Sequence, residues 1–204
     1  MSRDMDPSRR QDFMAKFGLA WAIVATLLSL VSLGVALSSL RQARGRDHRL
    51  AGWSRWEKST GGNGHWYKAV LLPAGVTWTQ TEVLARQDGG YLATILSEAE
   101  NRFVFSLIDA PEFFTADHGS GPALGGFQQD GAPEPDGGWC WLSGAQWNYS
   151  NWMRTEPNNG SSRFGTEDRL QYYSGLGRTP AATWNDINRG DKSSPIFSYV
   201  AERD

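Results

Sequence analysis

The chain reads Glu-Pro-Asn-Asn-Gly at residues 156–160, Gly-Thr-Glu-Asp at 165–168 and Thr-Trp-Asn-Asp at 183–186. Together these three segments supply carboxylates and side-chain amides, and none of them contains His or Cys. Oxygen ligands of this kind suit a hard cation such as Ca²⁺, whereas softer metals prefer thiolate or imidazole. The alternative is that the segments are turns with solvated charges, because Pro, Gly, Asn and Asp also build turns.

The composition indicates one compact domain and excludes several kinds of function. The 204 residues carry a net charge of −2, so no basic footprint for nucleic acid is present. Ten Trp and 23 Gly are typical of a loop-rich domain with short strands. The single cysteine, Cys140, permits no intrachain disulfide and no Cys-based zinc site. No arrangement of a nucleophile with a base is evident, so we expect a protein that is not an enzyme.

An apolar segment precedes this domain. Residues 17–40 contain no charged residue, and a helix of that length reaches roughly 36 Å, enough to cross a bilayer core of about 30 Å. A cleaved signal peptide would have a shorter apolar region and a small-residue cleavage site. We therefore expect a polar tail over 1–16, a transmembrane signal-anchor helix over 17–40 and a basic juxtamembrane linker over 41–55.

The predicted anchor carries a stripe of small residues at alternating steps of three and four. Such stripes let helices approach closely in a membrane, so a homo-oligomer formed through this helix is possible, although a helix rich in Ala, Ser and Gly can carry one by chance. Arginine and lysine flank both ends of the segment, so the positive-inside rule gives no orientation. The stripe consists of Ala15, Gly18, Ala22, Ala25, Ser29, Ser32, Ala36, Ser39 and Ala43.

The domain itself reads as α+β. Residues 65–72 predict a strand that ends at Pro73 and Gly75, and residues 198–202 predict a closing strand that pairs with it. Residues 77–87 predict an amphipathic helix capped by Thr77 or Thr79. Tyr91–Ile95 predicts a short strand, and 97–109 a helix opened by a Ser97/Glu100 capping box. The expected core positions are Trp78, Val83 and Leu84 in the first helix and Phe103, Val104, Leu107 and Ile108 in the second.

In this order the motifs resemble the C-type lectin-like domain family over roughly residues 56–202. The segment 89–101 resembles the family's first-helix exit and second-helix start, and 124–127 its core Trp-Ile-Gly-Leu segment in degenerate form. The Glu-Pro-Asn, Glu-Asp and Trp-Asn-Asp motifs complete the match. The resemblance implies two helices, short antiparallel sheets and a long loop region. Family members usually carry two disulfides, but Arg169 stands where a cysteine normally follows Glu-Asp, so the resemblance is to disulfide-free bacterial relatives.

The resemblance also implies a site. It assigns one Ca²⁺ to Glu156, Asn158, Glu167, Asn185 and Asp186, and places a sugar on Glu156, Asn158, Glu167 and Asn185. In the family, Pro157 follows a cis bond, and the Glu-Pro-Asn order goes with mannose- or glucose-type hydroxyls. Without disulfides, the loops would depend on the ion for order, so its removal is expected to loosen residues 150–190 first.

Two functions follow from these observations. The first is a membrane-anchored, Ca²⁺-dependent carbohydrate-binding protein whose domain lies outside the cytoplasm, where a weak Ca²⁺ site would be filled. The second is a receptor-type module that binds protein, or that holds Ca²⁺ only for structure. Neither ligand identity nor membrane orientation follows from the sequence.

Overall fold

The computed structural model describes residues 52–160, 165–175, 179–190 and 195–204. The predicted tail, anchor helix and most of the predicted linker lie outside these ranges, as does the small-residue stripe. None of the helices in the described ranges has the length and apolar character that a membrane span requires. The domain expected from residue 56 onward is described almost completely.

The first elements run up to and along one long strand. β1 (Ser54–Arg55) and the 3-10 helix η1 (Lys58–Thr60) precede β2 (Trp66–Val76). The prediction that this strand ends at Pro73 was wrong, because β2 continues through Pro73 and Gly75 to Val76. Its register against the neighbouring strand β8 (Ile196–Arg203) shifts between Leu71 and Val76, and proline is tolerated in strands at such irregularities.

The first helix, α2 (Trp78–Gln87), begins with a complete capping box. The Thr77 hydroxyl accepts a hydrogen bond from the Gln80 amide, and the Gln80 side chain accepts one from the Thr77 amide. Trp78 is buried as expected, but Val83 is 51% exposed, and the other buried positions are Thr81 and Ala85. The prediction that Val83 lies in the core was therefore wrong, because the buried face of α2 is rotated toward Thr81 and Ala85. Leu84 packs against the core from a partly buried position.

β3 (Tyr91–Leu92) is shorter than the predicted strand, and α3 (Glu98–Ile108) follows it. Ser97 caps α3 by accepting from the Glu100 amide at 3.1 Å. Only this half of the predicted capping box forms, because a Glu100 carboxylate oxygen accepts from the Leu96 amide at 2.6 Å instead of from Ser97. Val104, Leu107 and Ile108 are buried as predicted, and Phe103 packs against the core from a partly buried position.

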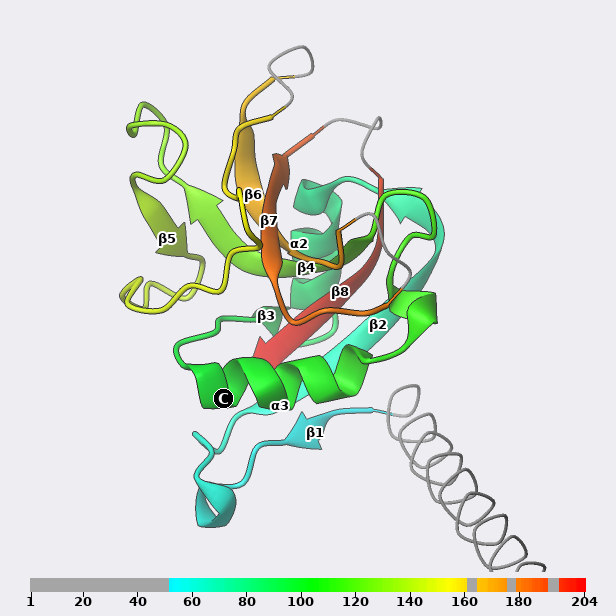
Figure 1. Cartoon of the computed structure of the whole chain (residues 1–204). Helices are drawn as coiled ribbons and strands as arrows, with labels where there is room; N and C mark the ends of the chain where they lie inside the picture. Colours follow the sequence, from blue (N-terminus) through cyan, green and yellow to red (C-terminus); the bar gives the residue numbers. More distant parts are fainter. Residues whose placement is uncertain (1–51, 161–164, 176–178, 191–194) are drawn as a thin grey trace, which may run out of the picture. The chain divides into compact units, whose positions relative to one another are not determined.

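All the strands join one sheet in the order β1-β2-β8-β4-β6-β7, with β3 paired to β8 and β5 to β4 (Figure 1). Antiparallel pairing was expected, and every pair is antiparallel except β4 with β8, which is parallel at Ala123 and Tyr199. The sheet is therefore mixed. The remaining elements are the 3-10 helix η2 (Pro111–Phe113) and the strands β4 (Ser120–Gln128), β5 (Trp139–Trp141), β6 (Glu167–Tyr173) and β7 (Trp184–Asn188).

The two ends of the domain meet in the sheet. β8 pairs with β2 from Trp66 opposite Arg203 through Leu71 opposite Ser198. This pairing confirms the predicted closing strand.

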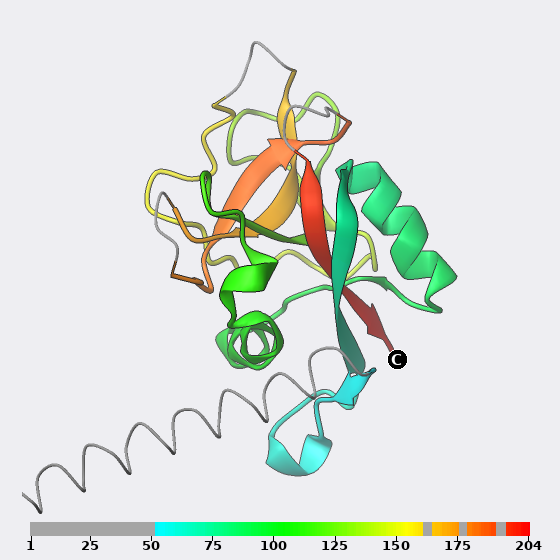
Figure 2. The same ribbon diagram turned by 90° about the vertical axis from the view of Figure 1, so that its right-hand side faces the viewer.

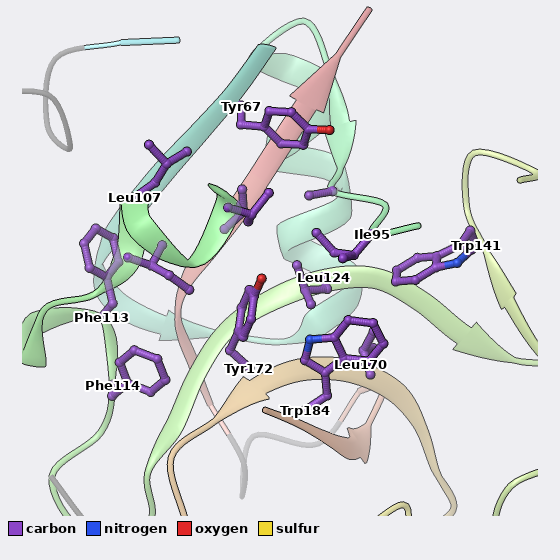
Figure 3. Close-up of a cluster of buried hydrophobic side chains, with 14 of the residues drawn as sticks. Tyr67, Ile95, Leu107, Phe113, Phe114, Leu124, Trp141, Leu170, Tyr172 and Trp184 are labelled. Atoms are coloured by element: carbon purple, nitrogen blue, oxygen red, sulfur yellow. The ribbon is translucent and has the colours of Figure 1, made fainter. Parts of the chain in front are cut away.

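Two hydrophobic clusters lie on the two faces of the β2–β8–β4 sheet, and one helix covers each (Figure 2). Val200 belongs to the cluster with α3, whereas its neighbours Tyr199 and Ala201 belong to the cluster with α2, as the alternation of a strand requires. Figure 3 shows the α3-side cluster, in which Tyr172 and Trp184 bring β6 and β7 into the core.

Arg169 stands where the resemblance leads us to expect a cysteine, and its side chain makes non-covalent contacts with neighbouring elements. Its guanidinium carbon lies 5.0 Å from the centre of the Trp78 ring and 5.7 Å from that of Phe127. Its Nη1 lies 3.2 Å from a carboxylate oxygen of Asp168. A cation between two aromatic rings is favourable, so non-covalent contacts join β6, α2 and β4 here.

Candidate functional site

Trp184 anchors the strand that carries two of the predicted ligands. The side chain is fully buried, and four aromatic residues lie within 6.1 Å of its ring centre. Its backbone amide donates to Asn151, and its carbonyl accepts from Met153. The loop that leads to Glu156 is therefore attached to the start of β7. The four aromatic neighbours are Trp141, Trp147, Tyr149 and Trp152.

Asn101 links this anchor to helix α3. Its Oδ1 accepts from the Tyr172 hydroxyl at 2.8 Å and from Trp184 Nε1 at 3.2 Å. Its Nδ2 donates to the Ala182 carbonyl at 3.0 Å. Asn101 is almost fully buried, so these bonds form where water cannot replace them. In the sequence, Asn101 stands out only as the last residue of the 89–101 motif, and no local signal indicates this buried role.

The three acidic and amide-rich segments come together in space. The backbone amides of Asn158 and Asn159 donate to the Asp186 carboxylate, at 3.1 and 2.7 Å for the shorter bonds. The Gly160 amide donates to the Glu167 carboxylate at 2.8 Å. The residues between 156 and 160 thus contact both β6 and β7. The Glu156–Pro157 bond is cis, which confirms that expectation.

Burial raises the pKa of all three carboxylates at this place, and neighbouring negative charges add to the shift for Glu156 and Glu167. Burial, the Asp186 charge, the hydrogen bond to Asp186 and the Glu167 charge raise the pKa of Glu156 to about 7. Burial and the Asp186 charge raise the pKa of Glu167, and the Gly160 amide opposes the shift. Burial also raises the pKa of Asp186, against the hydrogen bonds from Asn159 and Asn158. The local field is strongly negative, which favours a cation.

The arrangement fits an ion that takes oxygen ligands, in two respects. All the side chains of the predicted site offer oxygen atoms as ligands, and Glu156 Oε2 is buried with no hydrogen-bond partner in the part of the chain that the structure describes. A buried carboxylate oxygen without a donor is costly, and a cation would satisfy it.

The acids do not form a complete ligand set. No three His, Cys, Asp or Glu side chains in the described ranges are grouped so that they could hold a metal by themselves. The amide oxygens are therefore needed to complete the set. At present Asn158 is exposed, and Asn185 Nδ2 donates to the Asp186 carbonyl at 2.7 Å. The five predicted ligands remain a prediction.

The loop contains two residues whose φ angle is positive, Thr155 at 81° and Asn159 at 47°. This region is unusual for residues other than glycine, and asparagine tolerates it better than a β-branched threonine. They flank the Glu-Pro-Asn motif on both sides. The Asn-Gly pair after Glu-Pro-Asn was a turn signal that could have drawn attention to Asn159.

Comparison with known proteins supports the same fold. No family model matches the chain. Ladderlectin from Oncorhynchus mykiss is 28% identical over 160 residues, which cover 73% of this chain and 72% of that protein.

Among solved structures, the cow CD23 carbohydrate-recognition domain, determined in the presence of a GlcNAc2Man3 oligosaccharide, matches with a TM-score of 0.54 at 20% identity. The match covers 75% of this chain and 93% of that one. A calcium-independent type II antifreeze protein matches with a TM-score of 0.52 at 19% identity, over 75% and 92% of the two chains. At such identities the similarity concerns the fold.

The described part of the chain has the C-type lectin-like fold. The relatives and structural neighbours that share this fold are non-enzymatic binding modules, in agreement with the expectation that this chain is not an enzyme. The source organisms named for the matching proteins are animals, so the comparisons give no support to the expectation of bacterial relatives.

Proposed function

We propose that the protein binds carbohydrate through a Ca²⁺ ion held by Glu156, Asn158, Glu167, Asn185 and Asp186. One observation carries this proposal: backbone hydrogen bonds draw together the segments that contain Glu156, Glu167 and Asp186, and Glu156 Oε2 is buried there without a hydrogen-bond partner among the described residues. Burial and the charges of Asp186 and Glu167 raise the pKa of Glu156, and a cation at the same place would favour its charged form. The similarity to ladderlectin and to the cow CD23 carbohydrate-recognition domain supports the sugar.

Four of the five ligand residues would have two tasks, because all except Asp186 would also contact the sugar. The ion would supply positions for two neighbouring sugar hydroxyls. Glu156 and Glu167 would each accept a hydrogen bond from a hydroxyl with the carboxylate oxygen that faces the sugar. Asn158 and Asn185 would donate to the sugar oxygens through their NH₂ groups. Both residue types are needed because each bound hydroxyl donates one hydrogen bond and accepts another.

The Glu156-Pro157-Asn158 order favours mannose- or glucose-type sugars. Exchange of the acceptor and donor, in the double variant Glu156→Gln plus Asn158→Asp, is expected to shift the preference toward galactose-type diols. The matched control is Asn148→Asp, which changes an amide to a carboxylate outside the proposed site. Unchanged mannose preference in the double variant would contradict the assigned roles of these two residues.

The proposal places the domain on a membrane. The uncharged segment 17–40 would anchor it, and the domain would lie outside the cytoplasm, where Ca²⁺ reaches about 10⁻⁴ to 10⁻³ M. Clustering of several copies would raise the apparent affinity by a factor of about 10² to 10⁴ if the geometry allows it. Protease accessibility on intact cells tests this orientation: digestion of the domain supports it, and protection contradicts it.

A second function is a protein-binding module, or a domain in which Ca²⁺ is structural. The fold match with a calcium-independent type II antifreeze protein favours this second function. That neighbour shares the fold but does not depend on calcium. A glycan array probed with the full-length protein, with and without EDTA, separates the two. Binding that EDTA abolishes supports the lectin, whereas Ca²⁺ uptake without any glycan binding supports the second function.

A further inference from the structure

Asn159 follows the Glu-Pro-Asn motif and is not among the predicted ligands. Its Oδ1 accepts a hydrogen bond from the Glu167 amide at 2.9 Å, and its own amide donates to Asp186 Oδ2 at 2.7 Å. A single residue therefore joins the loop to β6 through its side chain and to β7 through its backbone. Glu167 and Asp186 are both predicted ligands.

The hydrogen bonds around Asn159 form a continuous set. The amides of Asn158, Asn159 and Gly160 all donate to the carboxylates of Asp186 and Glu167. Three successive N–H groups point at the carboxylates and partly offset their negative charge. These hydrogen bonds lower the pKa of Asp186 and Glu167, against the rise that burial causes. These bonds need no ion.

The conformation of Asn159 makes this set possible. With φ at 47°, the backbone turns so that consecutive amides face the same side. Asparagine is one of the few residues other than glycine that enters this region readily. Its side-chain oxygen then reaches Glu167, eight residues further along the chain.

We propose that Asn159 is the positioning residue of this site: its side-chain oxygen fixes Glu167 against the Glu-Pro-Asn loop and gives the ligands their places before the ion binds. The inference rests on the proposed function for the ion. It adds that the site is largely formed in the ion-free protein. A preformed site binds more tightly, because less order is created on binding.

Three single variants of the full-length protein in detergent micelles test the role. Asn159→Gly removes the side-chain oxygen and keeps the positive φ without strain. Asn159→Asp retains an oxygen that can accept from Glu167. Thr155→Gly is the matched control, because Thr155 lies in the same loop at φ 81°, is exposed and makes no side-chain hydrogen bond among the described residues.

Two readouts separate positioning from general stability. In EDTA, hydrogen exchange at the Glu167 amide is expected to be about tenfold faster in Asn159→Gly than in the wild type, and unchanged in the other two variants. In a calorimetric titration with CaCl₂, Asn159→Gly is expected to bind about tenfold more weakly, whereas Asn159→Asp and Thr155→Gly bind at least as tightly as the wild type. Strands β2 and β8 should exchange alike in all four proteins.

Wild-type Ca²⁺ affinity or wild-type Glu167 exchange in Asn159→Gly would overturn the inference, as would equal losses in Asn159→Gly and Asn159→Asp. Failure of the proposed function looks different: the wild-type protein then takes up no Ca²⁺, while Glu167 exchange in EDTA still reports whether Asn159 holds the loop.

Discussion

At the scale of single residues, the loop region concentrates negative charge that the described residues compensate only in part. Glu156, Glu167 and Asp186 all have a raised pKa, and burial is the first cause in each case. Backbone amides partly compensate the negative charges of Glu167 and Asp186. Within the described ranges, no amide donates a hydrogen bond to Glu156 Oε2. Glu156 is therefore the group whose state depends most on an added cation.

The raised pKa of Glu156 predicts how stability depends on pH in EDTA. A carboxyl group whose pKa is higher in the folded than in the unfolded state stabilises the fold at low pH, and that contribution is lost as pH rises through the folded value. The melting temperature is therefore expected to fall as pH rises from the ordinary glutamate pKa of 4.5 to the folded Glu156 pKa of about 7, and to level off above it. Saturating Ca²⁺ should remove the fall, because the ion replaces the proton.

The control for this experiment is Glu156→Gln, which keeps the shape of the side chain and does not titrate. In EDTA its melting temperature should depend less on pH than that of the wild type. Equal slopes for the two proteins would contradict the assignment of the effect to Glu156.

At the scale of secondary-structure elements, buried hydrogen bonds place β6 and β7 against α3. Asn101 is the centre of this contact, since it accepts from both Tyr172 and Trp184. Trp184 in turn precedes Asn185 and Asp186. The position of the candidate site is therefore set from the core, by a residue that lies far from it in sequence.

Loss of the Asn101 side chain is expected to destabilise the whole domain. Asn101→Ala leaves the Tyr172 hydroxyl and Trp184 Nε1 buried without an acceptor, at a cost of about 1–3 kcal/mol for each group. We expect the free energy of unfolding to fall by about 3 kcal/mol, measured by urea denaturation. Asn151→Ala is the control, because Asn151 also donates to Ala182 but is only partly buried, and about 1 kcal/mol is expected there. Similar small losses in both variants would contradict the central role of Asn101.

Ion removal should act on the loops before the core. Repulsion between the carboxylates returns when Ca²⁺ leaves, so hydrogen exchange measured by mass spectrometry is expected to rise first within residues 150–190. The amides of 158–160 should exchange more slowly than the other amides of the loop over 153–160, because their acceptors are carboxylates that stay in place. Simultaneous loss of protection in β2 and β8 would contradict this order.

Much of the fold was predictable because local signals decide it. The Thr77 and Ser97 caps and the pairing of the last strand with the first were read from the sequence and are present. Val83 was misplaced because helix periodicity alone does not say which of two adjacent faces meets the sheet. The second half of the Ser97 box failed because Glu100 also bonds to Asn63 and Tyr67, which only the tertiary fold brings near.

The candidate site was predictable in composition but not in its internal support. The oxygen-rich motifs are visible in the sequence, and the structure brings their segments together. Asn159 and Asn101 are not visible in the same way, because their roles depend on a positive φ and on contacts with residues 8 and 83 positions away.

At the scale of the whole molecule, a described domain with the C-type lectin-like fold follows a predicted anchor over residues 17–40. The anchor and its stripe lie outside the described residues and remain predictions. If the proposed sugar site is present, the predicted consequence of anchoring is avidity, because clustering multiplies the effect of a weak single site.

Cross-linking in the membrane tests the predicted oligomer. Replacement of small residues by leucine in the double variant Ala25→Leu plus Ser29→Leu is expected to reduce cross-linking, because bulky side chains keep helices apart. Ala20→Leu plus Thr26→Leu, outside the stripe, serves as the control. Cross-linking unchanged in the first variant would contradict packing through the stripe.

The central claim is that Glu156 and Asp186 hold Ca²⁺, and calorimetric titration of the full-length protein with CaCl₂ tests it most directly. We predict one ion per chain with a Kd of about 10⁻⁴ to 10⁻³ M, as for weak extracellular sites, and a Kd weakened at least tenfold in Glu156→Gln. Absence of Ca²⁺ binding to the wild-type protein, or the same affinity in Glu156→Gln, would contradict the account.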